Sequence, residues 1–366
     1  MVSRYNFQHT PSAIPRDRSR PVATISIQET ITMTITHSPN YSLSRRDFVC
    51  RSSLGAGAVL LGREAIAEQA GSSRPASGEL PRRVLGRTQV PITLFTLGTA
   101  PCGHMDPPEI AKLVNVALDE GVNAVDTSEK YKNSQEGVGL ALGPRRKDVF
   151  LSTKVFANTI AEAEESLAKS IRLLKTDYFD LLYYHSLGNL DVSRALEPDG
   201  VFTWLLKQKK AGTCRFLGIS GHCIPSRFPR FLETGQVDVL LAVLNFVDCH
   251  TYNFEQTVLP VAVKHNVGVV AMKVFGGAAK MNYKQPQGPQ MPLEQIPVAL
   301  RYALSLPGVT TANLGVHSAE QIRHNVQMVR DFKPLSPEEM AALAPLGQEL
   351  AAKWGPHFGP VQEKTA

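Results

Sequence analysis

The fold is indicated by three apolar stretches that each end in an ionisable residue: Val122-Asn123-Ala124-Val125-Asp126, Val149-Phe150-Leu151-Ser152-Thr153-Lys154 and Phe179-Asp180-Leu181-Leu182-Tyr183-Tyr184-His185. A helix-length amphipathic segment separates each stretch from the next. This alternation predicts parallel strands joined by helices, and in a parallel barrel the carboxyl ends of all strands open on one face. We therefore expect Asp126, Lys154 and His185 to converge there, with Tyr131 five residues beyond Asp126.

Five further apolar stretches bring the number of predicted strands to eight. They span residues 92–97, 215–219, 237–244, 268–272 and 310–314. Near-continuous apolar strands are what a parallel sheet buried on both faces requires. Helices are predicted between the strands, at 108–118, 159–174, 202–211, 255–264, 293–304 and 318–329. The sequence thus predicts a (β/α)8 TIM barrel within residues 81–353.

Two additions to the barrel are predicted. Residues 83–90 precede the first strand and are typical of a small N-terminal β-hairpin that caps the barrel bottom. After the eighth unit, Ser336, Pro337 and Glu339 form a capping box and predict an extra C-terminal helix. Pro345 and Gly347 are expected to end or kink it, leaving 348–353 as a separate turn and 354–366 as a tail.

The composition and the distribution of charge indicate which kinds of partner to expect. The 366 residues include 43% apolar and 20% charged residues, which is typical of a soluble globular protein. Eight arginines and four acidic residues give the segment 1–67 a net charge of +4, whereas the remaining 31 basic and 29 acidic residues give +2. The body therefore has no charge excess that predicts binding to nucleic acid.

Cysteine spacing does not predict a metal site. None of the five cysteines, Cys50, Cys102, Cys214, Cys223 and Cys249, forms a CxxC pair. A disulfide among the last four is left open, and small buried residues are the favoured interpretation.

The N-terminal region resembles a bacterial twin-arginine export signal. Ser44-Arg45-Arg46-Asp47-Phe48 precedes a Gly/Ala-rich apolar stretch at 53–62 and the small-x-small sequence Ala65-Ile66-Ala67. We expect an upstream extension at 1–32, a signal region at 33–67 starting at Met33 and cleaved after Ala67, and a linker at 68–80. This predicts a periplasmic or exported protein with the export machinery as a partner. A disordered basic tail is the alternative.

The apolar stretch of the signal is too short to span a bilayer. No membrane span is therefore expected in the mature chain.

The most distinctive segments within residues 82–350 are Leu85-Gly86-Arg87-Thr88, Ser152-Thr153-Lys154 and the segments 121–131, 133–139 and 180–185. Through these segments the chain resembles the aldo-keto reductase family. The resemblance implies an NAD(P)H-dependent oxidoreductase that reduces an aldehyde or ketone by hydride transfer, or oxidises an alcohol in reverse. The expected substrate is accordingly a small-molecule carbonyl or alcohol.

The resemblance also implies roles for the four convergent residues. Tyr131 would be the general acid, and because an isolated tyrosine titrates near ~10 it holds its proton at neutral pH. Lys154 would stabilise the phenolate, Asp126 would hold Lys154, and His185 would orient the carbonyl. Singly, each has an ordinary structural interpretation, as an ion pair, a rim histidine or a loop aromatic residue.

The predicted cofactor site departs from the family pattern. Ser220 and Asn245 are kept, although Asn245 has an equally good structural interpretation at a strand end. Gly221 and Leu241 stand where the family has Asn and Gln, and Met272 stands where it has a tyrosine that stacks on the nicotinamide.

The remaining expected cofactor residues lie in two segments. Lys273, Gly276 and Gly277 would approach the pyrophosphate. Gln321 and Asn325 lie in the segment 315–325, which resembles the adenine and 2′-phosphate site. Gly315 and Gln321 replace its usual basic residues. The cofactor is therefore expected to be NADP or NAD, with a slight preference for NADP that the missing charges weaken.

Two other functions are compatible with the sequence. Because a fold does not fix a function, a non-catalytic nucleotide-binding or regulatory barrel is one alternative. A metal hydrolase using His185, His222 and His250 is the other, but the HxH and carboxylate spacing of such sites is missing.

Overall fold

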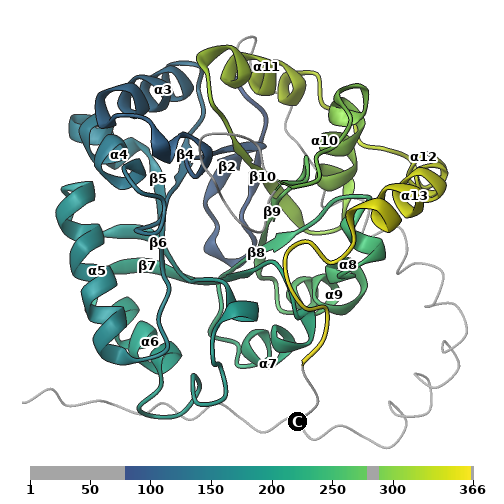
Figure 1. Cartoon of the computed structure of the whole chain (residues 1–366). Helices are drawn as coiled ribbons and strands as arrows, with labels where there is room; N and C mark the ends of the chain where they lie inside the picture. The colour runs from purple at the N-terminus through teal and green to yellow at the C-terminus, as the bar shows by residue number, and fades with distance from the viewer. Residues whose placement is uncertain (1–78, 278–287, 364–366) are drawn as a thin grey trace, which may run out of the picture. The chain divides into compact units, whose positions relative to one another are not determined.

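Eight parallel strands close into a barrel, with helices around it (Figure 1). The computed structural model describes residues 79–277 and 288–363, so the predicted signal region and most of the linker lie outside the described residues. The barrel order is β10-β3-β4-β5-β6-β7-β8-β9. The strands are β3 (Phe95–Gly98), β4 (Ala124–Asp126), β5 (Phe150–Val155), β6 (Phe179–Tyr184), β7 (Cys214–Gly221), β8 (Val239–Val243), β9 (Gly268–Met272) and β10 (Val309–Gly315). The predicted TIM barrel is confirmed.

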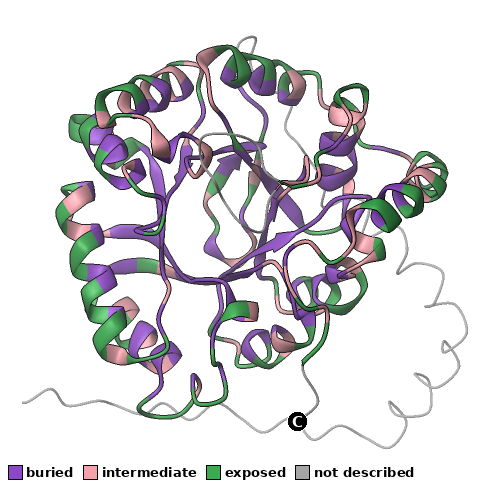
Figure 2. Ribbon diagram, in the orientation of Figure 1, coloured by how far each residue is buried: buried purple, intermediate pink, exposed green. Residues whose placement is uncertain are grey.

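Helices connect successive strands and cover the outside of the barrel. The α-helices are α3 (Pro107–Asp119), α4 (Ser134–Leu142), α5 (Ile160–Leu174), α6 (Val201–Ala211), α7 (Pro229–Leu232), α8 (Phe254–Thr257), α9 (Leu259–Lys264), α10 (Ile296–Ser305), α11 (Ala319–Arg330), α12 (Pro337–Ala342) and α13 (Ala344–Trp354). Short 3-10 helices lie at η2 (Gly86–Thr88), η3 (Pro101–His104), η4 (Gly143–Asp148), η5 (Leu187–Asn189), η6 (Pro225–Arg227), η7 (Asp248–His250) and η8 (Leu293–Gln295). In Figure 2 the barrel strands are largely buried and the helices expose one face.

Helix α5 shows how the local sequence specifies these elements. Thr159 accepts the backbone N–H of Glu162, and the Glu162 side chain accepts that of Thr159, so the two form a capping box. Ala163, Leu167 and Leu174 lie on its buried face. The cap satisfies backbone donors at the helix start, and the apolar face packs against the barrel.

The predicted N-terminal hairpin is present. β1 (Arg82–Val84) pairs antiparallel with β2 (Pro91–Thr93). Leu85, between them, packs against Gly268 at the start of β9, which places the hairpin at the N-terminal end of the barrel. The predicted first strand, 92–97, is divided: its beginning belongs to the hairpin, and only Phe95–Gly98 enters the barrel.

The helices after the eighth strand differ in part from prediction. The Ser336–Glu339 capping box is confirmed, but α12 ends at Ala342. Pro345 lies in the first turn of α13, where its missing N–H costs little, and Gly347 continues that helix. A Cβ atom at position 347 would lie 2.2 Å from the carbonyl oxygen of Phe246. Glycine therefore allows a close helix contact there, and the prediction of a separate turn at 348–353 was wrong.

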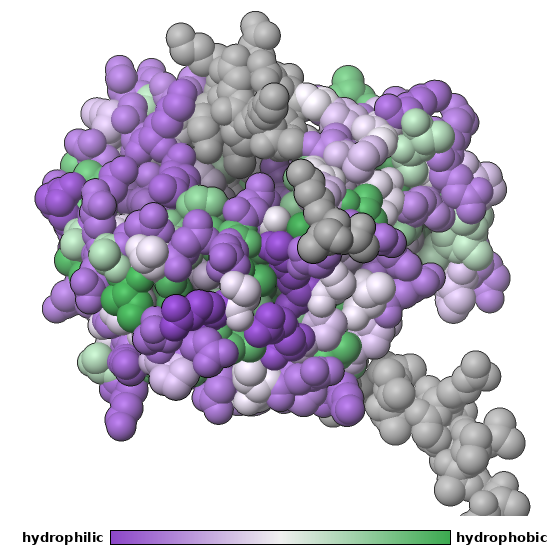
Figure 3. All heavy atoms as spheres, turned by 60° about the horizontal axis from the view of Figure 1, so that its bottom comes forward, coloured by the Kyte–Doolittle hydropathy of each residue, from purple (hydrophilic) through white to green (hydrophobic). Residues whose placement is uncertain are grey.

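Burial and hydropathy agree with this architecture. In the face drawn in Figure 3, hydrophilic side chains cover most of the described surface and apolar ones appear in small patches. Within residues 79–277 and 288–363, no helix has both the length and the apolar character needed to cross a bilayer. The apolar surface is largely inside, between the strands and the helices.

Candidate active site

Four predicted residues meet at the carboxyl ends of neighbouring strands. Asp126 is the last residue of β4, Lys154 lies near the end of β5, and His185 follows β6 directly. Tyr131 lies in the loop between β4 and α4, where its carbonyl oxygen accepts the N–H of Ser134 at 2.9 Å. All four side chains are buried. The alternation of strands and helices thus brings together residues that are far apart in the sequence.

Asp126 and Lys154 form a buried ion pair. Lys154 Nζ lies 2.5 Å from Asp126 Oδ2 and donates a second hydrogen bond, of 2.8 Å, to the carbonyl oxygen of Thr127. The Ser152 hydroxyl donates to Asp126 Oδ1 at 2.7 Å, and Asn313 Nδ2 donates to Asp126 Oδ2 at 2.8 Å. Three donors therefore fix the carboxylate, and the carboxylate in turn fixes the ammonium group.

The ammonium group faces the two aromatic residues. Lys154 Nζ lies 4.9 Å from the centroid of the Tyr131 ring. The rings of Tyr131 and His185 meet edge to face with their centroids 6.0 Å apart, and the ring of Phe156 contacts His185 in the same way. A cation beside a phenol and an imidazole is the arrangement expected for proton transfer to a bound oxygen.

Burial controls the charge states. It lowers the pKa of Lys154, and the nearby Asp126 carboxylate opposes this effect. Burial, followed by the charge of Lys154, lowers the pKa of His185 well below its ordinary value. His185 is therefore neutral at pH 7. Its Nδ1 atom is buried and has no hydrogen-bond partner among the described residues.

A cavity of about 400 Å³ begins at Tyr131 and Asp126 and extends along β8, β9 and β10 to the start of α11. Six of the eight predicted cofactor residues line it: Met272, Lys273, Gly276, Gly277, Gln321 and Asn325. A Cβ atom at position 276 would lie 2.7 Å from the carbonyl oxygen of Pro289, so only glycine fits there. The cavity has the size of a ligand site, and its α11 end suits a phosphate. These residues therefore fit a dinucleotide.

The other two predicted cofactor residues do not line this cavity. Ser220 Oγ accepts the backbone N–H of Ser186 at 3.1 Å. Asn245 caps the turn after β8: its Oδ1 accepts the N–H of Asp248 at 2.8 Å, and its Nδ2 donates to Asp248 Oδ2 at 2.7 Å and to the carbonyl oxygen of Lys273 at 3.0 Å. Both side chains thus make hydrogen bonds within the protein, as in the structural interpretation given above for Asn245.

The departures from the family pattern at Gly221 and Gly315 have steric reasons. A Cβ atom at position 221 would lie 2.6 Å from the Phe228 ring, and one at position 315 would lie 2.4 Å from the ring of Pro101. Phe228 and Pro101 thus occupy the space that larger side chains would need. The two glycines are consequences of local packing.

The α11 end of the cavity carries few fixed charges. Gln321 is exposed, and its Oε1 accepts the N–H of His317 at 2.7 Å. Arg323 Nε lies 3.3 Å from Glu120 Oε1 and does not line the cavity. His317 and His324 do line it. Imidazoles therefore stand at this end in place of guanidinium groups.

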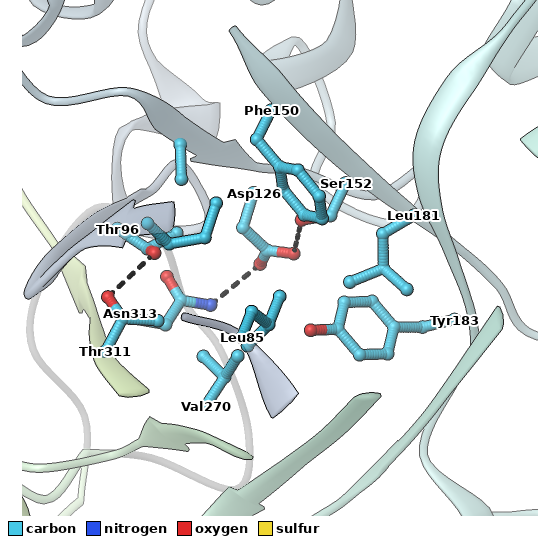
Figure 4. A pocket seen from close by; sticks show the side chains of 12 residues that line it. Leu85, Thr96, Asp126, Phe150, Ser152, Leu181, Tyr183, Val270, Thr311 and Asn313 are labelled. Atoms are coloured by element: carbon cyan, nitrogen blue, oxygen red, sulfur yellow. Dashed lines mark hydrogen bonds between the residues drawn. The ribbon is translucent and has the colours of Figure 1, made fainter. Parts of the chain in front are cut away.

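Sequence reasoning missed Asn313. It lines both the large cavity and a second, small cavity inside the barrel below Asp126. Figure 4 shows its amide directed at Asp126, and it shows the Tyr183 hydroxyl directed into the same space. The available signal was a single amide within the otherwise apolar end of β10, Ala312-Asn313-Leu314.

The described residues include no cluster of side chains suited to binding a metal ion. Among residues 79–277 and 288–363, no three His, Cys, Asp or Glu side chains gather in a way that could hold a metal ion. Cys102, Cys214, Cys223 and Cys249 are free thiols, and the first three are buried.

A parallel barrel with a buried lysine, a tyrosine and a neutral histidine at its mouth has the groups that the reduction of a carbonyl requires. The sequence profile of the Aldo/keto reductase family matches residues 94–296, and the chain belongs to this family. Bovine prostaglandin F synthase 1 (Bos taurus) is 26% identical over 295 residues, covering 71% of this chain and 89% of the relative.

Two solved structures share the fold. The holo form of an aldo-keto reductase from Bacillus halodurans is 24% identical with a TM-score of 0.58, covering 76% of this chain and 99% of that one. An aldo/keto reductase from Klebsiella pneumoniae, solved in complex with NADP and acetate, is 22% identical with a TM-score of 0.58, covering 72% of this chain and 94% of that one.

Proposed function

We propose that the protein is an NAD(P)H-dependent reductase of aldehydes or ketones in which Tyr131 is the general acid. The observation that supports this most directly is the buried chain of contacts from Asp126 through Lys154 to the Tyr131 ring, at one end of the cavity of about 400 Å³. When bound, the nicotinamide supplies the hydride. The same site would run the reverse oxidation of an alcohol.

In this proposal the chain's own residues manage the proton and the developing charge. A carbonyl oxygen beside Tyr131 and His185 accepts the proton of the Tyr131 hydroxyl. The Lys154 ammonium group stabilises the resulting phenolate, and Asp126 keeps that ammonium group in place. Because His185 is neutral, it can donate one N–H to the carbonyl oxygen without competing as an acid.

For the cofactor, we propose that Met272 and Leu241 provide an apolar surface for the nicotinamide and that Gly276 and Gly277 let the backbone approach the pyrophosphate. Lys273 lines the same stretch. Burial lowers the pKa of Lys273 to about 8, which leaves it mostly protonated at pH 7 and able to pair with a phosphate. NADP remains the preferred cofactor in this proposal, and a titration with NADPH and NADH measures the preference.

The test is Tyr131→Phe. We expect the rate of carbonyl reduction, followed by the absorbance of the reduced cofactor with a panel of aldehydes and ketones, to fall about 10²- to 10⁴-fold. Cofactor affinity, measured by fluorescence titration, should stay at the wild-type value. Tyr184→Phe is the matched control, because the Tyr184 hydroxyl is a buried donor to the carbonyl oxygen of Ala157 at 3.2 Å. Undiminished turnover by Tyr131→Phe would refute the assignment.

A further inference from the structure

Asn313 reaches Asp126 across an intervening strand. It lies on β10 and Asp126 on β4, with β3 between them in the barrel. On β3, Gly98 pairs with Asp126 on one side and with Gly315 on the other. A Cβ atom at position 98 would lie 2.4 Å from Asn313 Oδ1. The glycine therefore provides the space through which the amide passes.

The orientation of the amide is set by its partner. An ionised carboxylate can only accept hydrogen bonds, so the atom that faces Asp126 Oδ2 at 2.8 Å is the donor Nδ2. Asn313 Oδ1 is left buried, with no hydrogen-bond partner among the described residues. An apolar residue at this position would avoid that unsatisfied oxygen. An amide at this position leaves one oxygen unsatisfied, but it also donates a hydrogen bond to Asp126, which an apolar residue could not do.

We propose that Asn313 is a positioning residue that holds Asp126, and through it Lys154, in the geometry used by the reductase proposed above, on whose activity this inference rests. Asp126 Oδ2 receives both Lys154 Nζ and Asn313 Nδ2. The two donors reach this oxygen from β5 and β10, which lie on different sides of β4 in the barrel, and Ser152 holds the other oxygen. Figure 4 shows the contacts of Asn313 and Ser152 with Asp126. Without Asn313, the carboxylate loses one of its three donors.

The first variant is Asn313→Leu, which keeps the branched shape and removes the donor. We expect kcat to fall about 10- to 100-fold, the effect of losing one hydrogen bond to a charged group. The Asp126 carboxylate then carries more uncompensated negative charge, which opposes the stabilisation of a Tyr131 phenolate by Lys154. The titration midpoint of Tyr131 should therefore move up by about one pH unit, a tenfold change in its proton affinity.

That midpoint is measured without turnover. Protein labelled with 3-fluorotyrosine is titrated by ¹⁹F NMR, and the Tyr131 resonance is assigned by its loss in Tyr131→Phe. The matched control is Thr311→Val, on the same strand and beside the same small cavity, where the Thr311 hydroxyl pairs with that of Thr96 at 2.9 Å. This control should leave both kcat and the Tyr131 titration unchanged. An unshifted Tyr131 titration in a folded Asn313→Leu protein would overturn the proposal.

A second variant, Asn313→Asp, keeps the shape of the side chain and tests whether position 313 must donate a hydrogen bond to Asp126. At low pH the introduced carboxyl group is protonated and donates to Asp126, so activity is retained. As pH rises the group ionises and repels Asp126, and activity falls. A wild-type pH profile in this variant would contradict the proposal. A wild-type protein without carbonyl reduction would refute the reductase, whereas an upward Tyr131 shift in Asn313→Leu would still support the positioning role.

Discussion

Asp126 and Lys154 form an ion pair that water barely reaches, with side chains 4% and 1% exposed. Desolvation of such a pair is costly, and it offsets much of the attraction between the two charges. Removing one partner alone typically costs about 3–5 kcal/mol, because the other charge stays buried without compensation. The pair is therefore an expensive way to stabilise a barrel. In the function proposed above, the pair has a chemical purpose instead, because Lys154 Nζ lies 4.9 Å from the centroid of the Tyr131 ring.

Two histidines at the carboxyl end of the barrel make folding stability depend on pH. In the folded state the pKa of His185 is held well below its ordinary value, chiefly by burial, and burial also lowers the pKa of His222 to about 3. An unfolded histidine titrates near ~6.5, so below this pH the unfolded state binds protons that the folded state does not. The contribution is fully present above about pH 6.5 and is lost as pH falls toward the folded pKa.

We predict that the free energy of unfolding decreases by about 1.4 kcal/mol for each pH unit below about 6.5 on account of His185 alone. His185→Gln should therefore flatten the acid limb of stability, measured by urea unfolding at several pH values. His324→Gln is the control, because His324 is exposed in the folded state and its replacement should leave the limb unchanged. An unaltered acid limb in His185→Gln would contradict the proposed neutral imidazole.

At the scale of elements, the start of α11 and the end of β10 together shape the far end of the cavity. Ser318 caps α11 by accepting the N–H of Gln321 at 3.2 Å. Gly315, which closes β10, is held to glycine by the ring of Pro101. Gln321, by contrast, is exposed. Of the two positions where the family pattern has a basic residue, only 321 has room for one.

We predict that Gln321→Arg strengthens NADPH binding by about tenfold and leaves NADH binding unchanged, because a guanidinium group pairs with the 2′-phosphate that only NADPH carries. The measurement is a fluorescence titration with each cofactor at low and high salt, and the gain should shrink in high salt. The control is Gln327→Arg, which adds the same charge at an exposed position of the same helix, near Asp331 and outside the cavity. An equal gain for NADH would show that position 321 does not face the 2′-phosphate.

The sequence predicts those site residues whose position can be inferred from their own strand alone. Asp126, Lys154 and His185 each come at or near the end of an apolar run, so the barrel rule alone places them together. The same rule does not single out Asn313, because it lies within its apolar run and not at the end of it. Only the structure shows that its amide passes Gly98 and reaches Asp126. The sequence also does not show whether a polar residue at a strand end forms its hydrogen bonds with a ligand or with another part of the protein. Only the structure shows that Ser220 is bonded to Ser186.

At the scale of the whole molecule, the two ends of the barrel have different tasks. The N-terminal end is closed by the hairpin, where Arg83 Nη1 donates to the carbonyl oxygens of Leu304 and Val309 at 2.7 and 2.8 Å. The C-terminal end holds the buried Asp126–Lys154 pair and the cavity. Burying the ion pair at the C-terminal end is costly for folding stability. The closed N-terminal end and the barrel strands provide the rigid elements on which that site is built.

We propose that residues 33–67 direct export of this barrel and that the cofactor is loaded beforehand. A twin-arginine route carries folded proteins, and a free nicotinamide pool is not expected outside the cytoplasm. In a bacterial host we predict a periplasmic protein that starts at Glu68, with dinucleotide released from it on denaturation. Mass spectrometry and an enzymatic cofactor assay measure the two. Arg45→Lys with Arg46→Lys should leave the uncleaved precursor in the cytoplasm, and Arg51→Lys is the matched control. A periplasmic protein that retains its leader, or that never carries dinucleotide, would contradict this proposal.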